Sequence, residues 1–218
     1  MIAVTPSFGA LQRSARLAFA PFPAARRYDD CLDMSAPESR RGLTKEEGAR
    51  FRGLVDAHFD FIWRSLRGLG VSPASIDDAA QQVFWTASQK LAAIAVGSER
   101  SYLFATARGI AANARRSQQR NREMLDDDVL ATQLDHAPDP EQAASARQAR
   151  EHLDRILDGL PEELRAVFVL FELEGQTTSE IALLLDAPMG TVASRLRRAR
   201  DEFQAAAQRF QATQRGKP

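Results

Sequence analysis

The sequence has 218 residues, of which 44% are hydrophobic and 27% charged, and this composition is typical of a globular protein of one or two domains. No stretch approaches the roughly twenty consecutive apolar residues of a membrane-spanning helix, so we expect no membrane insertion and a cytoplasmic location. Cys31 is the single cysteine, which excludes an intramolecular disulfide. The three histidines lack the helical spacing of a metal site, so we predict neither a metal nor another cofactor.

The formal net charge is zero, but the charges are segregated along the chain. Residues 99–122 contain six arginines and one acid, and residues 188–200 contain four arginines and no acid. Between them, residues 123–142 contain seven acids and no base. This pattern predicts two basic elements separated by an acidic connector.

The apolar spacing predicts an all-α protein with two small helical domains joined by a flexible acidic linker. Residues 1–45 contain prolines and have no sustained apolar period, so we interpret them as a mobile extension. One alternative is that translation starts at Met34, so that residues 1–33 result only from the choice of an earlier start codon. A further alternative is a transit peptide. Residues 46–117 are predicted to form a bundle of three or four helices. Residues 118–146 are the predicted linker, residues 147–210 the second domain, and residues 211–218 a tail.

The second domain has the sequence of a helix-turn-helix. A capping box in Thr177–Glu180 opens a short apolar helix, and a tight turn at 186–190 precedes a final helix from about Thr191. On that helix a stripe is predicted to be buried: Val192, Leu196, Ala199 and Phe203. The opposite surface is predicted to carry Ala193, Ser194, Arg197 and Arg198, with Arg195 on the flank. Arginines there are available for guanine edges and phosphates, although they also suit a merely solvated helix.

The last helix of the first domain carries a second candidate surface. Tyr102, Thr106, Gly109 and Asn113 share one side of it, and its arginines are Arg108, Arg115 and Arg116, with Arg120 and Arg122 beyond. Aromatic, small polar and basic groups together suit a single nucleic-acid strand, because bases stack on aromatics and phosphates follow the arginines. Tyr102 is equally consistent with packing.

Over residues 50–205 the chain resembles the extracytoplasmic-function (ECF) sigma factors, small bacterial transcription initiation factors of the sigma-70 family. Three segments carry the resemblance: Asp77–Phe84, which is similar to the polymerase-binding helix of region 2; Tyr102–Ala111, similar to its promoter-melting and −10-reading helix; and Leu160–Arg200, similar to region 4.

The resemblance implies a function without catalysis. It implies that Asp77, Asp78, Gln81 and Gln82 bind the β′ clamp helices of RNA polymerase core, and that region 4 sits on the β flap. It implies that the loop at about 96–100 captures a base of the −10 strand, and that the next helix binds the strand through Tyr102, Thr106, Arg108, Asn113, Arg115 and Arg116. The −35 element is then read by Thr191, Ser194, Arg195, Arg197 and Arg198. An anti-sigma protein is the implied regulator.

The family usually has lysine or arginine at the position of Ala193, so the −35 sequence read by this chain is expected to differ. The main alternative function is a dimeric helix-turn-helix regulator that binds duplex DNA without polymerase. Such a regulator should carry a ligand, receiver or dimerisation module in its first domain, where this chain has an acidic helix and an aromatic–basic helix.

Overall fold

The computed structural model describes residues 44–124 and 152–215. Every element in these two ranges is a helix, so the predicted all-α class is confirmed. The predicted N-terminal extension and most of the predicted acidic linker lie outside the described residues. None of the helices described is long and apolar enough to span a bilayer.

The first helix in the described residues is α3 (Lys45–Gly68). Thr44 and Glu47 form a capping box, in which the Thr44 hydroxyl accepts from the Glu47 amide and the Glu47 carboxylate accepts from the Thr44 amide. These two bonds satisfy amides that have no partner inside the helix. The helix ends at Gly68.

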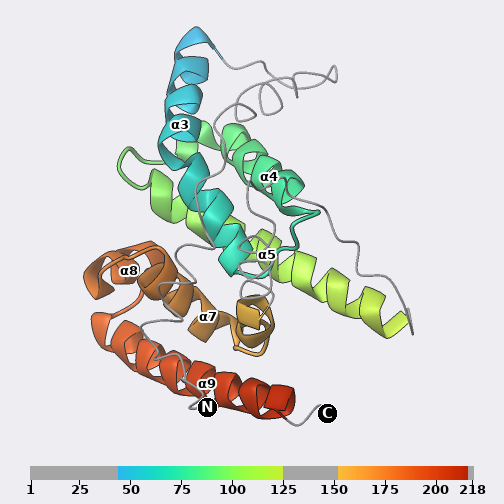
Figure 1. The fold of residues 1–218 in the computed structure, drawn as a ribbon. Helices are drawn as coiled ribbons and strands as arrows, with labels where there is room; N and C mark the ends of the chain where they lie inside the picture. Colours follow the sequence, from blue (N-terminus) through green and yellow to red (C-terminus); the bar gives the residue numbers. More distant parts are fainter. Residues whose placement is uncertain (1–43, 125–151, 216–218) are drawn as a thin grey trace, which may run out of the picture.

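Two further helices pack on α3, as Figure 1 shows. These are α4 (Ile76–Gln89) and α5 (Glu99–Met124), connected by the short 3-10 turn η2 (Leu91–Ala93). Two aromatic pairs bind the three together: Phe59 stacks on Phe84 with centroids 5.8 Å apart, and Phe61 meets Phe104 at 5.9 Å. Residues 118–124, predicted as linker, are the last turns of α5.

Half-buried His58 on α3 makes the stability of this bundle depend on pH. Burial lowers the pKa of His58 below its usual 6.5, and the nearby Arg100 cation lowers it further, while Glu99 acts in the opposite direction. A lowered pKa means that the folded state binds the proton less well than the unfolded chain does. The resulting stability is therefore present above about pH 6.5 and is lost as the pH falls through the folded-state pKa.

We expect His58→Gln to remove this part of the pH dependence. Urea denaturation of both proteins from about pH 7.5 to about pH 5 measures it, since carboxylates common to both cancel in the difference. Parallel curves of unfolding free energy against pH would contradict the assignment.

The C-terminal helices form the second unit. Residues 152–158 are helical, and are followed by α7 (Glu162–Phe168), the π-helical turn η3 (Val169–Leu173), α8 (Thr178–Leu185) and α9 (Met189–Arg215). Phe168 of α7 stacks on Phe203 of α9 at 4.7 Å. Helix α9 reaches Arg215, so residues 211–215, predicted as a tail, are helical.

The two units pack directly against each other. In Figure 1, α7 and α8 lie between α9 and the group formed by α3, α4 and α5. One continuous apolar core joins Phe61, Leu66 and Phe104 of the first unit to Leu170 and Ile181 of the second. At Gly68 the backbone approaches η3 so closely that an added Cβ would lie 2.7 Å from a methyl group of Val169.

Ion pairs across the same boundary surround this core. Arg64 forms a two-pronged bond to the Glu174 carboxylate, which is nearly fully buried, with a closest distance of 2.9 Å. Arg67 reaches Asp154 at 2.6 Å. Because hydrogen-bonded pairs with a buried partner are less screened than surface pairs, they favour one orientation of the two units.

Candidate nucleic-acid interface

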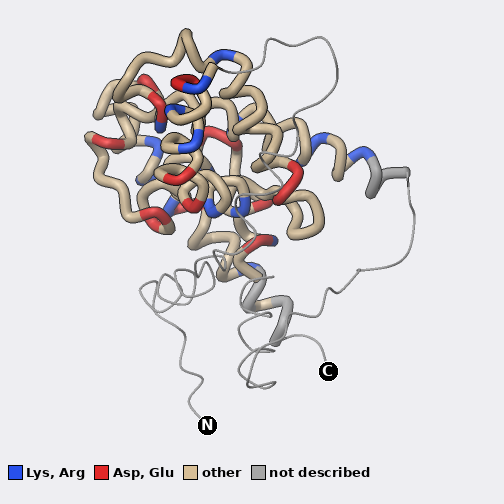
Figure 2. Tube along the Cα trace, turned by 90° about the horizontal axis from the view of Figure 1, so that it is seen from above, with Lys and Arg blue, Asp and Glu red and all other residues tan. Residues whose placement is uncertain are grey.

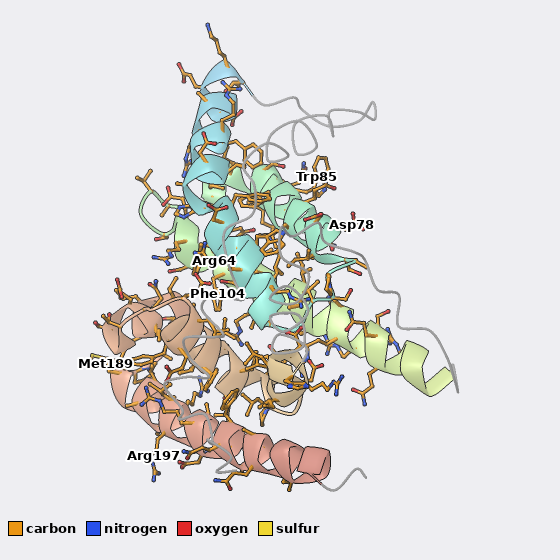
Figure 3. The ribbon with its side chains drawn as sticks, viewed as in Figure 1. Arg64, Asp78, Trp85, Phe104, Met189 and Arg197 are labelled. Atoms are coloured by element: carbon orange, nitrogen blue, oxygen red, sulfur yellow. The ribbon has the colours of Figure 1, made fainter. Side chains whose placement is uncertain are left out.

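The outer face of α4 carries the acidic surface predicted from the sequence. Asp77, Asp78 and Gln82 are exposed and Gln81 is half-buried. In Figure 3, Asp78 and Trp85 project from the side of α4 that faces away from the C-terminal helices. Asp77 also has a structural role that the pattern did not reveal, because its carboxylate accepts a hydrogen bond from the Trp63 indole at 3.0 Å. Asp78 forms no ion pair within the described residues, so its charge is available to a partner.

The predicted strand-binding side of α5 is open to solvent. Tyr102 and Thr106 are half-buried, and Gly109, Asn113 and Arg116 are exposed. The Thr106 hydroxyl donates to the Tyr102 carbonyl at 2.9 Å, and Arg116 donates to the Asn113 side chain at 2.7 Å. Tyr102 also packs partly against the core, which agrees with the packing interpretation, and part of its side chain stays accessible.

The other two arginines of this predicted set, Arg108 and Arg115, point toward the C-terminal unit. Arg108 lies 3.7 Å from the Glu162 carboxylate at the start of α7. Arg115 lies near Asp158 in a pocket between α5 and the segment that leads into α7. The predicted −10 residues therefore fall into two groups: an open face with Tyr102 and Arg116, and a flank covered by the second unit. Figure 2 shows basic positions along the end of α5 that projects from the body.

The helix-turn-helix is formed by α8 and α9. The predicted capping box is present, because the Thr177 hydroxyl accepts from the Glu180 amide and the Glu180 carboxylate accepts from the Thr177 amide at 2.7 Å. The Thr177 amide, and less strongly the Thr177 hydroxyl, donate to the Glu180 carboxylate and lower its pKa. Asp186 takes the left-handed conformation, with φ of +48°, to end α8. Helix α9 then starts at Met189, two residues before the predicted start.

The two sides of the recognition helix α9 are as predicted. The stripe of apolar side chains is buried, comprising Val192, Leu196, Ala199 and Phe203. The opposite surface is exposed and comprises Ala193, Ser194, Arg197 and Arg198. Figure 3 shows Arg197 projecting away from the body of the protein, on the far side from Asp78. Thr191 is half-buried, and its carbonyl accepts from the Ser194 hydroxyl at 2.9 Å.

Known proteins with similar sequences support the assignment of a helix-turn-helix to α8 and α9. A family model described as "Sigma-70, region 4" matches residues 150–203, which contain both helices of the helix-turn-helix. The ECF RNA polymerase sigma-E factor of Escherichia coli K12 is 40% identical over 68 residues, 31% of this chain and 36% of that protein. The ECF sigma factor SigE of Mycolicibacterium smegmatis is 28% identical over 151 residues, 69% of this chain and 58% of that protein.

The chain is similar to ECF sigma factors, and residues 150–203 match region 4 of the sigma-70 family. The matches span less than two thirds of the length of these relatives. Two solved structures have the same overall fold: CnrH in complex with the cytosolic domain of CnrY, and the sigma factor RpoE with the anti-sigma factor NepR from Bartonella quintana. Each has a TM-score of 0.53 at 18% sequence identity. The match to CnrH covers 88% of this chain and 96% of the CnrH chain. The match to RpoE covers 73% of this chain and 97% of the RpoE chain.

The structure adds acidic partners that the sequence pattern did not reveal. Glu162 and Glu163, on the first turn of α7, pair with Arg108 of α5 and Arg195 of α9. The sequence had placed Arg195 on the flank of α9, and its position beside Glu163 agrees with that. In the described arrangement, one arginine of each predicted DNA-binding set is therefore held by α7.

Proposed function

We propose that this chain is a sigma factor, which binds RNA polymerase core and directs it to promoters without catalysing a reaction itself. The observation that carries the proposal is the coincidence of the region 4 match with a helix-turn-helix whose recognition helix exposes Arg197 and Arg198. A helix with this exposure fits the major groove, where arginine pairs with guanine and phosphate. In the proposed complex this helix reads the −35 element, and the C-terminal unit sits on the β flap.

The first unit has two roles in this proposal. The outer face of α4 binds the β′ clamp helices, with Asp78 supplying charge that no described residue neutralises. The open face of α5 holds the melted −10 strand, and the loop before it accepts one base. Unstacking a base costs a few kcal/mol, which stacking on an aromatic such as Tyr102 and contacts to phosphate can offset.

We also propose an anti-sigma protein as a partner. The two solved structures described above are complexes, and the partner of RpoE is named as an anti-sigma factor. A partner that covers the α4 face or the recognition helix would compete with polymerase or promoter for the same exposed charges.

Run-off transcription with purified bacterial core polymerase tests the proposed function. We expect promoter-dependent transcripts only when the chain is added, and weak binding of duplex by the chain alone, because each unit offers few base contacts. The alternative is a dimeric regulator of duplex DNA. Nanomolar, sequence-specific binding by the isolated protein at physiological salt, with no effect on core polymerase, would favour that alternative.

The three arginines of the recognition helix are expected to differ in their contributions. Arg197→Ala or Arg198→Ala should cost about 1–3 kcal/mol and reduce preference at one or two −35 positions. Arg195→Ala should weaken binding to all sequences alike, because Arg195 lies on the flank beside Glu163, where we expect it to contact phosphate rather than a base edge. A −35 mutation scan with holoenzyme distinguishes the two effects.

Ala193→Arg should strengthen promoter binding by holoenzyme. Ala193 is exposed beside Arg197, so a long basic side chain there gains a phosphate or guanine contact at no cost in packing. Filter-binding affinity measured at several salt concentrations checks this. Unchanged affinity of Ala193→Arg, together with unchanged base preference in the two alanine variants above, would mean that this face does not meet DNA.

A further inference from the structure

The loop between α4 and α5 has a first half anchored in the core and an exposed second half, which we call the crest. Leu91 and Ile94 are buried and anchor its first half. Its crest, residues 95–98, is exposed, and Val96 has 87% of its surface accessible, the largest exposure among the large apolar side chains described. An apolar side chain held outward on a short loop is available for contact with a flat apolar surface such as a nucleobase.

The shape of this loop depends on one arginine from a different helix. Arg50, in the second turn of α3, donates to the Leu91 carbonyl at 3.0 Å and to the Ile94 carbonyl. These two carbonyls lie on either side of the 3-10 turn, and they are separated from Arg50 by about forty residues of sequence. The planar guanidinium fits both acceptors at once, which a lysine ammonium does not do with the same geometry.

Glu99 connects the same guanidinium to the crest. Its carboxylate lies 3.8 Å from Arg50 and accepts the Gly97 amide at 2.6 Å. Gly97 has φ of +88°, a left-handed conformation that side-chain-bearing residues rarely adopt, so the turn at the crest needs glycine as well as this bond. The loop passes directly into α5, because the Tyr102 amide donates to the Ser98 carbonyl at 3.0 Å.

We infer that Arg50 is a positioning residue that sets the −10 base selectivity of this protein through the loop, with Glu99 as its intermediary. This inference rests on the proposed function, in which the loop accepts a base from the strand held by α5. The two hydrogen bonds of Arg50 are to the first half of the loop and not to its crest. The Arg50 guanidinium holds the Leu91 and Ile94 carbonyls and orients Glu99, and this contact chain fixes where Val96 and the crest amides meet the base. A pre-ordered loop discriminates bases because a poorly fitting base cannot be accommodated by a change in the loop.

The test compares Arg50→Gln with Arg52→Gln in holoenzyme with bacterial core polymerase. Arg52 is a matched control, because it is an exposed arginine on the same helix and contacts no part of the loop in the described structure. Hydrogen exchange of residues 91–99 reports the loop, and run-off transcription from templates carrying each base at each −10 position reports selectivity.

We expect Arg50→Gln to accelerate exchange at the crest and to reduce discrimination at one −10 position by about tenfold, the scale of a single mismatch in a protein–DNA site. The −35 preference and the affinity for core polymerase should stay unchanged, since neither surface includes the loop. Arg50→Lys should retain only part of the discrimination, and Glu99→Gln should resemble Arg50→Gln in a weaker form. Arg52→Gln should behave as the wild-type protein in both measurements.

Any of three results would overturn the inference. Arg50→Gln could leave hydrogen exchange of the loop unchanged, or it could accelerate exchange and leave the −10 base preference unchanged. It could also change transcription equally for all −10 positions, which would indicate a general loss of strand binding. Failure of the proposed function is distinguishable from these, because the wild-type protein would then give no promoter-dependent transcript. If Arg50→Gln does not fold, Glu99→Gln carries the same test, since it removes the ionic link to the crest and leaves the two carbonyl bonds of Arg50 in place.

Discussion

Asp78→Lys is expected to reduce affinity for core polymerase by at least about thirtyfold, or about 2 kcal/mol, because placing like charges opposite one another at an interface costs several kcal/mol. Asp78 is the cleaner choice of the two acids on α4. Its neighbour Asp77 accepts the Trp63 indole hydrogen bond, so a substitution there alters the packing of α4 on α3 as well as the surface charge.

Titration of labelled core polymerase with each variant measures this effect. Asp56→Lys is the matched control, since Asp56 is an exposed aspartate on α3 and the charge change is identical. We expect the control to bind as the wild-type protein, and both variants to unfold at the wild-type urea concentration. Wild-type affinity of Asp78→Lys for core enzyme would mean that the outer face of α4 does not meet polymerase.

Local patterns in the sequence were sufficient to predict the helix-turn-helix and the two sides of α9. The capping box at Thr177 and the apolar period of α9 depend only on residues within a few positions of one another. The burial of Val192 and Phe203 and the exposure of Arg197 follow from the same period. A periodicity of this kind reports which side of a helix is apolar, and for α9 that side is the buried one.

Contacts between segments far apart in the sequence were not predictable in this way. Nothing near Arg108 indicated that Glu162 would pair with it, because the two are brought together only when the C-terminal unit packs on α5. The hydrogen bonds of Arg50 were not predictable either, because their acceptors are backbone carbonyls. Every residue has such a carbonyl, so the sequence pattern does not indicate which ones an arginine will bind. Phe104 of α5 is fully buried in the core that the two units share, and this contact also depends on residues far apart in the sequence.

Arg165 on α7 shows most clearly how the two units depend on each other. Its side chain is fully buried, donates to the Leu69 carbonyl at 3.0 Å, and pairs with Asp158 at 3.0 Å. Burial, and secondarily the nearby Arg115 cation, lowers the pKa of Arg165 to about 10, while Asp158 opposes the shift. The side chain is thus a buried cation at neutral pH, held by one acceptor from each unit.

Arg165→Ala should lower the free energy of unfolding by about 2–4 kcal/mol, because it leaves a cavity and deprives the buried Leu69 carbonyl of its donor. Arg165→Met fills most of the volume and removes the cost of burying a charge, so its loss should be no more than about half as large. Urea denaturation of both variants measures the difference, with Arg197→Ala as an exposed control expected to stay within about 0.5 kcal/mol of wild type. If Arg165→Ala stayed within about 1 kcal/mol of the wild-type value, the Arg165 contacts would not stabilise the junction. If Arg165→Met lost as much as Arg165→Ala, the lost hydrogen bonds rather than the cavity would account for the effect.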